Sequence, residues 1–478
     1  MKAEFIRIEP FAFKQILSAD IKKGMNTHGG GVVCGYIRDE DEEQYTLYVI
    51  GSTPVILYAI DEDGEEQVFF YGILADLNIS RENSQLLMEV RFTSYTRLMD
   101  LLPQNRAFQS AACTYNEIIS HLCAGYEGSA FIMNPLFSNI PIQELIVQYQ
   151  ETNWEFLLRL ASHFNSMVIS DFLTPGVKFY FGLPNRQPVG NIIDSEYRLE
   201  KSLISYQQKI QNGVIGTSEY DDMLVVWNSR ELLEVGDRKL FEDRPYVVYA
   251  SQSQLNGHQL YHTYILATEN GLKIPKLYNK SIIGASIDGI VTGVQGTVVN
   301  IRMGIEDVQP SARWYPYATV FSSPDGSGWY CMPQAGDEIR LYFPTRSEKH
   351  AYAISSVHKP VASQPRNGNQ GSSAEAAPPR TNVLNNELRS QDGKVVQLLE
   401  DRIVMSNGKG LTISMVDNQG IGVVSNGDLN LKATGQVFVS GSSLNISGST
   451  EVSIKSGESS ITLSGSDAII KSANVKVQ

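Results

Sequence analysis

Residues 429–477 read LNLKATGQVFVSGSSLNISGSTEVSIKSGESSITLSGSDAIIKSANVKV, and this stretch decides the fold. It is built from triplets in which two apolar residues flank a third residue, and the triplets recur every seven to nine residues. Alternation with a period of two places the outer residues of each triplet on one face of a strand, and the intervening glycines favour turns. Each repeat therefore predicts a short strand and a turn. The triplets are 429–431, 437–439, 444–446, 452–454, 461–463, 468–470 and 475–477.

A strand of this length exposes too little apolar surface to close a core by itself, so the repeats must stack on neighbours. A parallel β-helix made by one chain needs longer rungs, of roughly twenty residues. Three chains wound around one axis solve the problem with short repeats. We therefore expect residues 393–478 to form an intertwined trimeric β-helix, or β-prism, that acts as a spike. Its predicted core consists of Leu429, Leu431, Val437, Val439, Leu444, Ile446, Val452, Ile454, Ile461 and Leu463.

Two segments precede the repeats. Residues 361–392 are rich in Pro, Ser, Asn and Gly and have almost no apolar pattern, which predicts a linker. Residues 284–360 alternate as strands do, and this predicts a small five-stranded barrel. The side chains expected on shared faces of that barrel are Thr297, Val299, Ile301 and Met303, and Ile339, Leu341 and Phe343.

Residues 1–283 predict two barrel-like α/β subdomains, so the whole chain is expected to be mainly β with some α. Two helices are well marked by capping boxes, in which a threonine precedes a glutamate by three residues. One box is Thr114 with Glu117, and the other is Thr152 with Glu155. The residues expected to be buried by these helices are Ile118, Ile119 and Leu122, and Trp154, Leu157, Leu158, Ala161 and Phe164.

Composition restricts the classes of protein that fit. A chain of 478 residues with 42% hydrophobic and 19% charged residues is globular and too long for one core. Its net charge of −13 argues against nucleic acid as a partner. Four widely spaced cysteines favour a reducing cytosol. The first residues contain no apolar signal segment, so we expect assembly in the cytoplasm and release as part of a particle.

Several segments resemble the VgrG-type spikes of type VI secretion, which are related to the baseplate hub and central spike of contractile phage tails. The most specific is IVQYQETNWEFLLRLASHFNSMVISD at 146–171, which is similar to the strand and helix that begin the family's second hub barrel. FFYGILADLNI at 69–79 and the segment 94–122 resemble the first hub barrel and its connecting helix. Trp314-Tyr315-Pro316, Gly326-Ser327-Gly328-Trp329 and MPQAGDEIRLYF at 332–343 resemble the oligosaccharide/oligonucleotide-binding (OB) barrel of the family.

This resemblance implies tandem hub barrels at 1–283, an OB-type neck at 284–360 and a spike at 393–478. It implies a homotrimer whose three hubs form a pseudo-sixfold ring that matches a hexameric inner tube protein, with baseplate proteins and effector cargo as further partners. Some relatives carry a lysozyme-like domain between barrel and spike, or an effector domain after the spike. The short linker and the end at Gln478 leave room for neither, so we expect a structural protein.

Three groups of residues resemble parts of catalytic or metal-binding sites. His28-Gly29-Gly30-Gly31 matches the oxyanion loop of lipases, but the chain has no G-x-S-x-G nucleophile motif. His121 and Cys123 lie about 200° apart on a helix and cannot converge with Cys113 on one metal ion. Ser162 and His163 are adjacent on a helix and point to different faces, so Asp171 does not complete a triad. We expect no catalytic, cofactor or metal site.

The predicted function is mechanical: the chain joins the inner tube to the baseplate and pierces a target envelope when the sheath contracts. Two alternatives remain, a tail fibre or adhesin and a secreted β-helical carbohydrate-active protein. The first would usually carry an aromatic-rich tip after the repeats, and the second needs paired carboxylates on a repeat ladder. The sequence leaves open whether the machine is a phage tail, a bacteriocin, an extracellular injection particle or a secretion system.

The last strands predict a further partner. Three copies of an apolar strand end leave open edges and an apolar cross-section, which favours a separate cap. Phage spikes that close their own tip bind iron through histidines, but the last histidine is His358. We therefore expect a small cone-shaped protein of the proline-alanine-alanine-arginine repeat type (a PAAR-like cap) to dock on Ile469, Ile470, Val475 and Val477.

Overall fold

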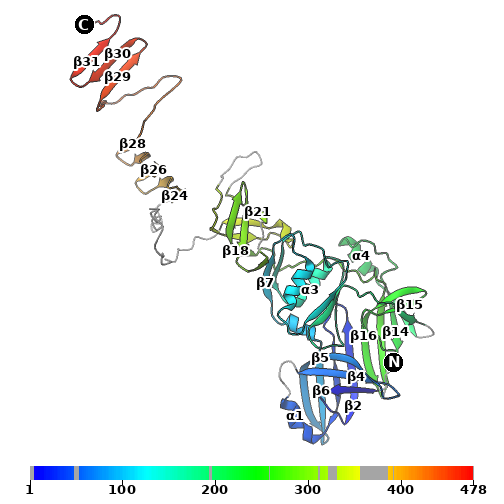
Figure 1. Cartoon of the computed structure of the whole chain (residues 1–478). Coiled ribbons are helices and arrows are strands. Elements are labelled where there is room, and N and C mark those ends of the chain that lie inside the picture. Colours follow the sequence, from blue (N-terminus) through cyan, green and yellow to red (C-terminus); the bar gives the residue numbers. More distant parts are fainter. Residues whose placement is uncertain are drawn as a thin grey trace. The chain divides into compact units, whose positions relative to one another are not determined.

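A computed structural model of the chain describes residues 5–47, 53–192, 196–257, 259–309, 313–320, 331–355, 386–390 and 392–476. The chain divides into two compact units, Met1–Ala362 and Ser363–Gln478 (Figure 1). The described residues form six sheets and four short α-helices, which confirms the prediction of a mainly β fold with some α. The predicted linker falls largely outside the described residues, as does the loop with Gly326 and Trp329.

The largest sheet of the first unit has twelve strands, in the order β1-β4-β5-β6-β3-β2-β16-β17-β14-β13, with β15 paired to β16 and β12 to β15. Their bounds are β1 (Phe5–Glu9), β2 (Gln15–Gly24), β3 (Gly30–Ile37), β4 (Pro54–Ile60), β5 (Glu66–Glu82), β6 (Gln85–Thr93), β12 (Pro188–Asn191), β13 (Tyr197–Lys201), β14 (Met223–Ser229), β15 (Arg238–Phe241), β16 (Arg244–Asn256) and β17 (Gln259–Ala267).

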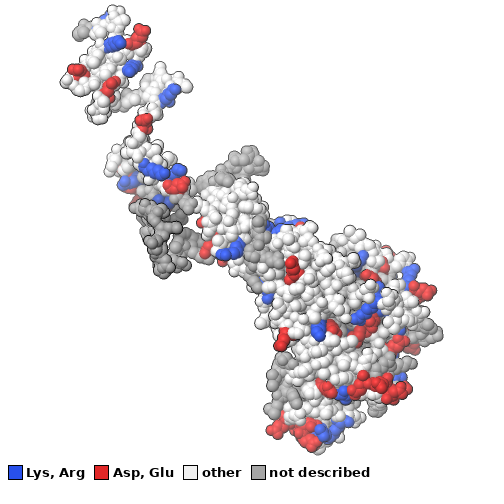
Figure 2. Space-filling view, in the orientation of Figure 1, with Lys and Arg blue, Asp and Glu red and all other residues white. Residues whose placement is uncertain are grey.

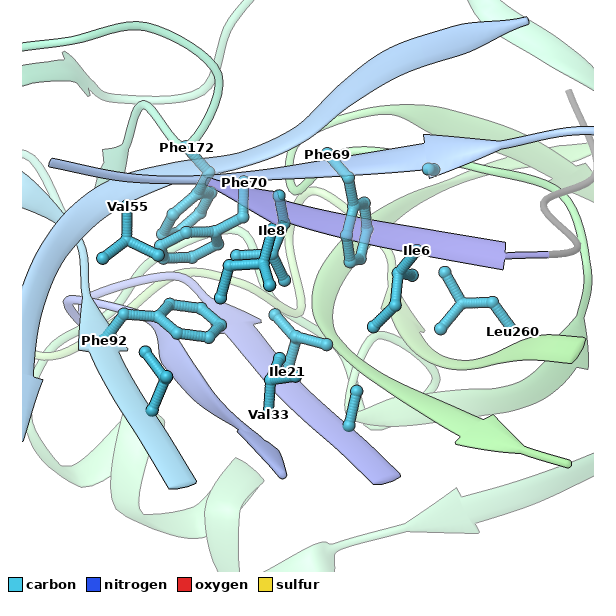
Figure 3. Close-up of a cluster of buried hydrophobic side chains, with 14 of the residues drawn as sticks. Ile6, Ile8, Ile21, Val33, Val55, Phe69, Phe70, Phe92, Phe172 and Leu260 are labelled. Carbon is cyan, nitrogen blue, oxygen red and sulfur yellow. The ribbon is translucent and has the colours of Figure 1, made fainter. Parts of the chain in front are cut away.

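The antiparallel pairing of β2 with β16 makes the two halves of residues 1–283 one sheet. Asp20 pairs with Gln254 and Gly24 with Ala250 along this seam. The core of the first half also receives side chains from beyond it, because Phe172 stacks on Phe70 at 5.7 Å between ring centroids and Leu260 enters the same cluster (Figure 3). The predicted hub barrels are therefore parts of one continuous sheet, and no ladder closes it among the described residues.

A helical layer follows the first six strands. It contains η2 (Tyr95–Asp100), α2 (Tyr115–Cys123) and α3 (Asn153–Ser162), packed with a three-stranded sheet of β8 (Ala130–Met133), β10 (Val168–Ser170) and β11 (Lys178–Phe181). Both predicted capping boxes are present. The Thr114 side chain accepts from Glu117 N while Glu117 Oε2 accepts from Thr114 N at 2.7 Å, and Thr152 and Glu155 repeat the arrangement. Three further helices of residues 1–283 are η1 (Asp39–Asp41), α1 (Glu42–Leu47) and α4 (Leu203–Gln211).

The strand at 146–151, which was expected to begin the second hub barrel, belongs to a separate three-stranded sheet. β9 (Ile146–Glu151) pairs with β7 (Gln104–Phe108), which also pairs with β20 (Glu306–Gln309), so the expectation for β9 was wrong. Val147 of β9 is buried in the core of the following domain. The period of two predicted the strand correctly, but it does not select the partner strand.

Residues 284–355 contain a five-stranded sheet in the order β21-β19-β18-β22-β23. The strands are β18 (Ser286–Gln295), β19 (Val298–Met303), β21 (Trp314–Pro316), β22 (Glu338–Tyr342) and β23 (Tyr352–Ser355), with η3 (Glu348–His350) between the last two. The predicted inward residues are buried, except Thr297, which lies exposed in a turn. An isolated bridge between Tyr317 and Ala353 brings the two ends of the sheet together. Among the described residues no continuous ladder closes the predicted barrel.

The second unit contains two antiparallel meanders. The first is β24 (Asn386–Arg389), β25 (Val395–Leu398), β26 (Arg402–Ser406), β27 (Thr412–Val416) and β28 (Gly420–Val424). The second is β29 (Glu451–Ser456), β30 (Ser459–Ser464) and β31 (Asp467–Lys471), with turns at Gly457 and Gly465 in the left-handed region. Residues 425–450 between the meanders form no strand.

Candidate assembly interface

The second unit has no core in the single chain. None of its described residues, 386–390 and 392–476, is buried, whereas four buried hydrophobic clusters lie in the first unit. Burial of apolar surface is the main driving force of folding, and a sheet with an uncovered apolar face is incomplete. The apolar side chains of this unit are therefore the candidate functional surface.

The first meander places nine of its apolar residues in two cross-strand rows on one face. The register pairs place these side chains directly opposite one another on neighbouring strands. All except Val396 are between 40% and 72% exposed, so no part of the chain that the structure describes buries them. The rows are Leu388, Val396, Met405, Ile413 and Val423, and Leu398, Ile403, Met415 and Ile421.

The sequence prediction missed these residues. Residues 403–405, 413–415 and 421–423 have the same apolar-x-apolar form as the later triplets, at similar spacing. The same apolar-x-apolar pattern, followed from residue 393 onward, identifies these three triplets. The candidate interface therefore begins at β24, well before Leu429.

The second meander carries five residues predicted for the core or the cap contact, together with Ala468, in two shorter rows. Val452, Leu463 and Ala468 form one, and Ile454, Ile461 and Ile470 form the other. Ile469, the middle residue of the triplet 468–470, lies in neither row.

Ile469 pairs with Thr462 and lies on the opposite face of β31 from Ile470. Two of the four residues predicted to contact a cap, Ile469 and Ile470, therefore do not share a face. Val475 lies beyond the last strand and is exposed, and Val477 lies outside the described residues.

Six predicted core residues lie in the strandless segment 425–450. All of them are between 59% and 79% exposed, and none pairs with another strand in the single chain. Two antiparallel meanders pair within themselves, but an isolated triplet has no neighbour with which to exchange backbone hydrogen bonds. These residues are Leu429, Leu431, Val437, Val439, Leu444 and Ile446.

The lipase-like segment at 28–31 leads into β3, which begins at Gly30. His28 Nδ1 lies 3.0 Å from Thr96 Oγ1 and its Nε2 lies 3.3 Å from Asp100 Oδ2, while its ring packs on Trp154. Burial lowers the pKa of His28, although Asp100 opposes that shift. Thr96 resembles a nucleophile beside a histidine, but it is fully buried and bonded to Ser170 Oγ at 2.9 Å. A substrate has no access to this hydroxyl in the folded chain.

The glycines that follow His28 are required by close packing. Gly29 has φ +63°, and a Cβ there would lie 2.4 Å from the ring of Phe172. A Cβ on Gly30 would meet the carbonyl oxygen of Phe92 at 2.4 Å. A Cβ on Gly31 would lie 2.6 Å from the carbonyl oxygen of Asp20, so close packing accounts for all three glycines.

The second catalytic candidate is dispersed. Ser162 Oγ donates to the carbonyl oxygen of Arg159 at 2.6 Å and accepts from Leu277 N at 2.8 Å. His163 Nδ1 lies 2.8 Å from Tyr115 Oη, and burial lowers the pKa of His163 to about 3. Asp171 Oδ1 accepts from Leu173 N. The three side chains have separate structural partners.

The cysteine and histidine candidates are also separate. Burial raises the pKa of the thiols of Cys113 and Cys123 to about 11, which disfavours the thiolate form that binds metals. His121 packs edge-on against Phe108 at 6.1 Å between ring centroids. In the part of the chain that the structure describes, no group of three His, Cys, Asp or Glu residues is arranged to hold a metal ion. No helix in that same part is long and apolar enough to cross a membrane.

Comparison with known proteins gives matches by structure alone. No family model matches the sequence, and no curated protein does. A chain of the Francisella PdpA-VgrG complex in its half-lidded form matches with a TM-score of 0.53 and 11% identity, over 87% of each chain. The lidless form matches with a TM-score of 0.51 and 11% identity, over 85% of this chain and 93% of that one.

The E. coli c3393 protein matches with a TM-score of 0.51 and 13% identity, over 73% of this chain and 98% of that one. It is described as a component of the type VI secretion system with structural similarity to the bacteriophage T4 tail proteins gp27 and gp5. The chain has the fold of a VgrG-type hub and spike. In this VgrG-type fold the hub carries the buried cores, and the repeat region carries exposed apolar rows that the single chain leaves uncovered.

Proposed function

We propose that the chain is the trimeric hub and spike of a contractile injection machine, of the type VI or phage-tail kind. Three copies would close one core between their repeat regions, and the rigid spike would be driven into a target envelope when the sheath contracts. The apolar rows of the two meanders carry this proposal, because an uncovered apolar face requires partners, and identical copies offer identical rows. The likeness of fold to VgrG-containing structures supports it.

The proposal includes the other parts of such a machine. The hub would contact a hexameric inner tube protein and baseplate proteins, a PAAR-like cap would close the spike tip, and effector cargo would travel with it. The particle would be assembled in the cytoplasm and then released or fired. Catalysis forms no part of this role, and each catalytic candidate described above has a structural partner instead.

The test is the mass of the purified full-length protein in solution. Light scattering is expected to give three times the mass of one chain, and residues 386–476 are expected to resist proteases in that state. A monomer whose repeat region is already resistant to proteases would overturn the proposal, because such a region would not need partners to fold.

The same preparation separates the proposed function from its alternatives. A spike is expected to copurify with tube or baseplate proteins when the neighbouring genes are expressed with it. Strong binding to whole cells or polysaccharide without these partners would favour an adhesin or a carbohydrate-active protein.

A further inference from the structure

Two segments of the first unit that are far apart in the sequence meet at one tyrosine. The guanidinium carbon of Arg346 lies 4.3 Å from the centroid of the Tyr278 ring, and Lys276 Nζ lies 5.6 Å from the same centroid. Both cations are exposed to solvent, whereas Tyr278 is half-buried. The face of an aromatic ring attracts cations, so Tyr278 holds two positive charges close together at the surface.

The backbone on both sides of Tyr278 is tied to the interior of the unit. Leu277 N donates to Ser162 Oγ of α3 at 2.8 Å, and the buried Asn279 donates through Nδ2 to the carbonyl oxygen of Tyr149 at 2.7 Å. These hydrogen bonds fix the position of the ring before any partner arrives. A preorganised platform of this kind lowers the entropic cost of binding.

The acidic residue closest to Arg346 in the sequence does not neutralise it. Glu348 Oε1 instead lies 2.9 Å from Nη1 of the buried Arg159, which also binds a second carboxylate. Among the described residues, neither Arg346 nor Lys276 forms a salt bridge. The two positive charges at Tyr278 are therefore available to a partner.

The positive character extends along both segments. Residues 273–280 contain three lysines and no acidic residue, and Lys280 is exposed two positions after Tyr278. Lys349 is exposed three positions after Arg346. The chain as a whole has a net charge of −13, and in Figure 2 acidic side chains gather around α1. We name one group of five residues the Tyr278 surface: Lys276, Tyr278, Lys280, Arg346 and Lys349.

Two exposed carboxylates lie on neighbouring elements. Glu155 Oε2 accepts from Thr152 N as part of the capping box of α3, and Glu144 lies just before β9. Neither forms a salt bridge with the Tyr278 surface in the part of the chain that the structure describes. The four cations of the surface therefore keep their charge available.

We propose that the Tyr278 surface binds an acidic segment of a partner protein, with Arg346 and Lys276 as the principal contacts. A guanidinium donates two parallel hydrogen bonds to a carboxylate, and a position over an aromatic ring leaves its edges free for them. Charge complementarity favours an anionic partner. The net charge of −13 repels an extended polyanion such as nucleic acid, whereas a short acidic segment meets only the cations of this surface. The inference concerns the single chain and does not depend on the proposed trimer.

Binding of a fluorescein-labelled hexaglutamate peptide to the full-length protein tests the assignment. Fluorescence anisotropy is expected to show binding at about 50 mM NaCl that weakens strongly at about 300 mM, because salt screens exposed charges. Arg346→Gln is expected to raise the Kd about fivefold, since it removes the bidentate donor. The matched control is Arg302→Gln, which removes the same charge from an exposed position on β19 outside the surface and should leave the Kd unchanged.

A second variant tests the platform itself. Tyr278→Leu keeps every charge and removes the ring, so its Kd for hexaglutamate is also expected to rise, and thermal unfolding of each variant verifies that the fold is retained. Equal Kd values for Arg346→Gln and Arg302→Gln would overturn the assigned site, as would the absence of binding at low salt. Tighter binding of a labelled DNA hexamer than of hexaglutamate would overturn the choice of an acidic protein segment. The mass of the protein in solution decides the proposed trimer separately.

Discussion

Arg159 of α3 and Glu348 of η3 form an ion pair between residues 189 positions apart, with Nη1 and Oε1 2.9 Å from each other. Arg159 Nη2 also lies 2.8 Å from Glu151 Oε2 and 2.7 Å from the carbonyl oxygen of Val147. The guanidinium is buried, so these acceptors satisfy it in place of water. The network joins the helical layer, through α3, to the domain at residues 284–355, through Glu348.

Removal of this arginine should weaken the first unit strongly. Arg159→Leu leaves the buried Glu151 and the partly buried Glu348 without their cation, and the loss of one partner from a buried pair costs about 3–5 kcal/mol. Denaturant unfolding followed by tryptophan fluorescence measures the change. The control is Arg198→Leu, which removes an exposed pair with Glu200 and should cost less than about 1 kcal/mol. An equal decrease in the free energy of unfolding in the two variants would show that the buried network stabilises the protein no more than an exposed ion pair does.

Acid should destabilise the hub through His262. Its Nδ1 lies 2.7 Å from Ser253 Oγ, and burial, with a smaller contribution from Lys23, lowers the pKa of His262 from 6.5 to about 4. Between these two values the unfolded chain binds a proton that the folded chain does not. Stability is therefore complete above pH 6.5 and decreases as pH falls toward 4, by up to about 1.4 kcal/mol per pH unit.

The measurement is unfolding by urea at pH 7.5 and at pH 5. His262→Gln should reduce the difference between the two, while replacement of the exposed His350 by Gln serves as the control. His163 contributes in the same direction, because burial lowers the pKa of that histidine as well. A His262→Gln variant with an unchanged pH dependence would rule out the buried imidazole as a source of acid sensitivity.

The two faces of β27 should respond differently to the same charge. Ile413 lies in an apolar row, while the adjacent Ser414 points to the other face. If three copies bury the rows, Ile413→Glu places three unpaired carboxylates near one axis, at a cost of several kcal/mol per chain. We expect light scattering and protease resistance to show a lost or weakened trimer for Ile413→Glu and an intact one for Ser414→Glu. The same behaviour in both variants would mean that the rows are not the contact.

Cap binding should depend on the last residues of the spike. Truncation before Ser472 leaves β31 intact and removes Val475 and Val477, so recovery of a coexpressed PAAR-like cap should fall by at least about tenfold. Val475→Asp should have the same direction of effect, with Asn474→Asp as the matched control. Undiminished recovery of the cap with the truncated trimer would place its contact elsewhere.

The sequence by itself determined the features that depend on neighbouring residues. A capping box is formed within four residues, so Thr114 and Thr152 marked the starts of α2 and α3 correctly. Strict alternation also predicted the buried sides of β19 and β22, because successive side chains of a strand point to opposite faces. The spacing of the triplets likewise predicted the strands around Ile454 and Ile461.

Tertiary structure alone decided which distant segments meet. Alternation of apolar residues with a period of two assigns the faces of a strand but does not identify the strand with which it pairs. No local pattern therefore showed that β16 is the neighbour of β2, or that β7 is the neighbour of β9. Nor did a local pattern show that Lys209 holds α4 by its polar side, or that Arg159 reaches Glu348. Those contacts form because a buried charge must find an opposite charge or hydrogen-bond acceptors wherever folding brings them, and sequence separation places no limit on that.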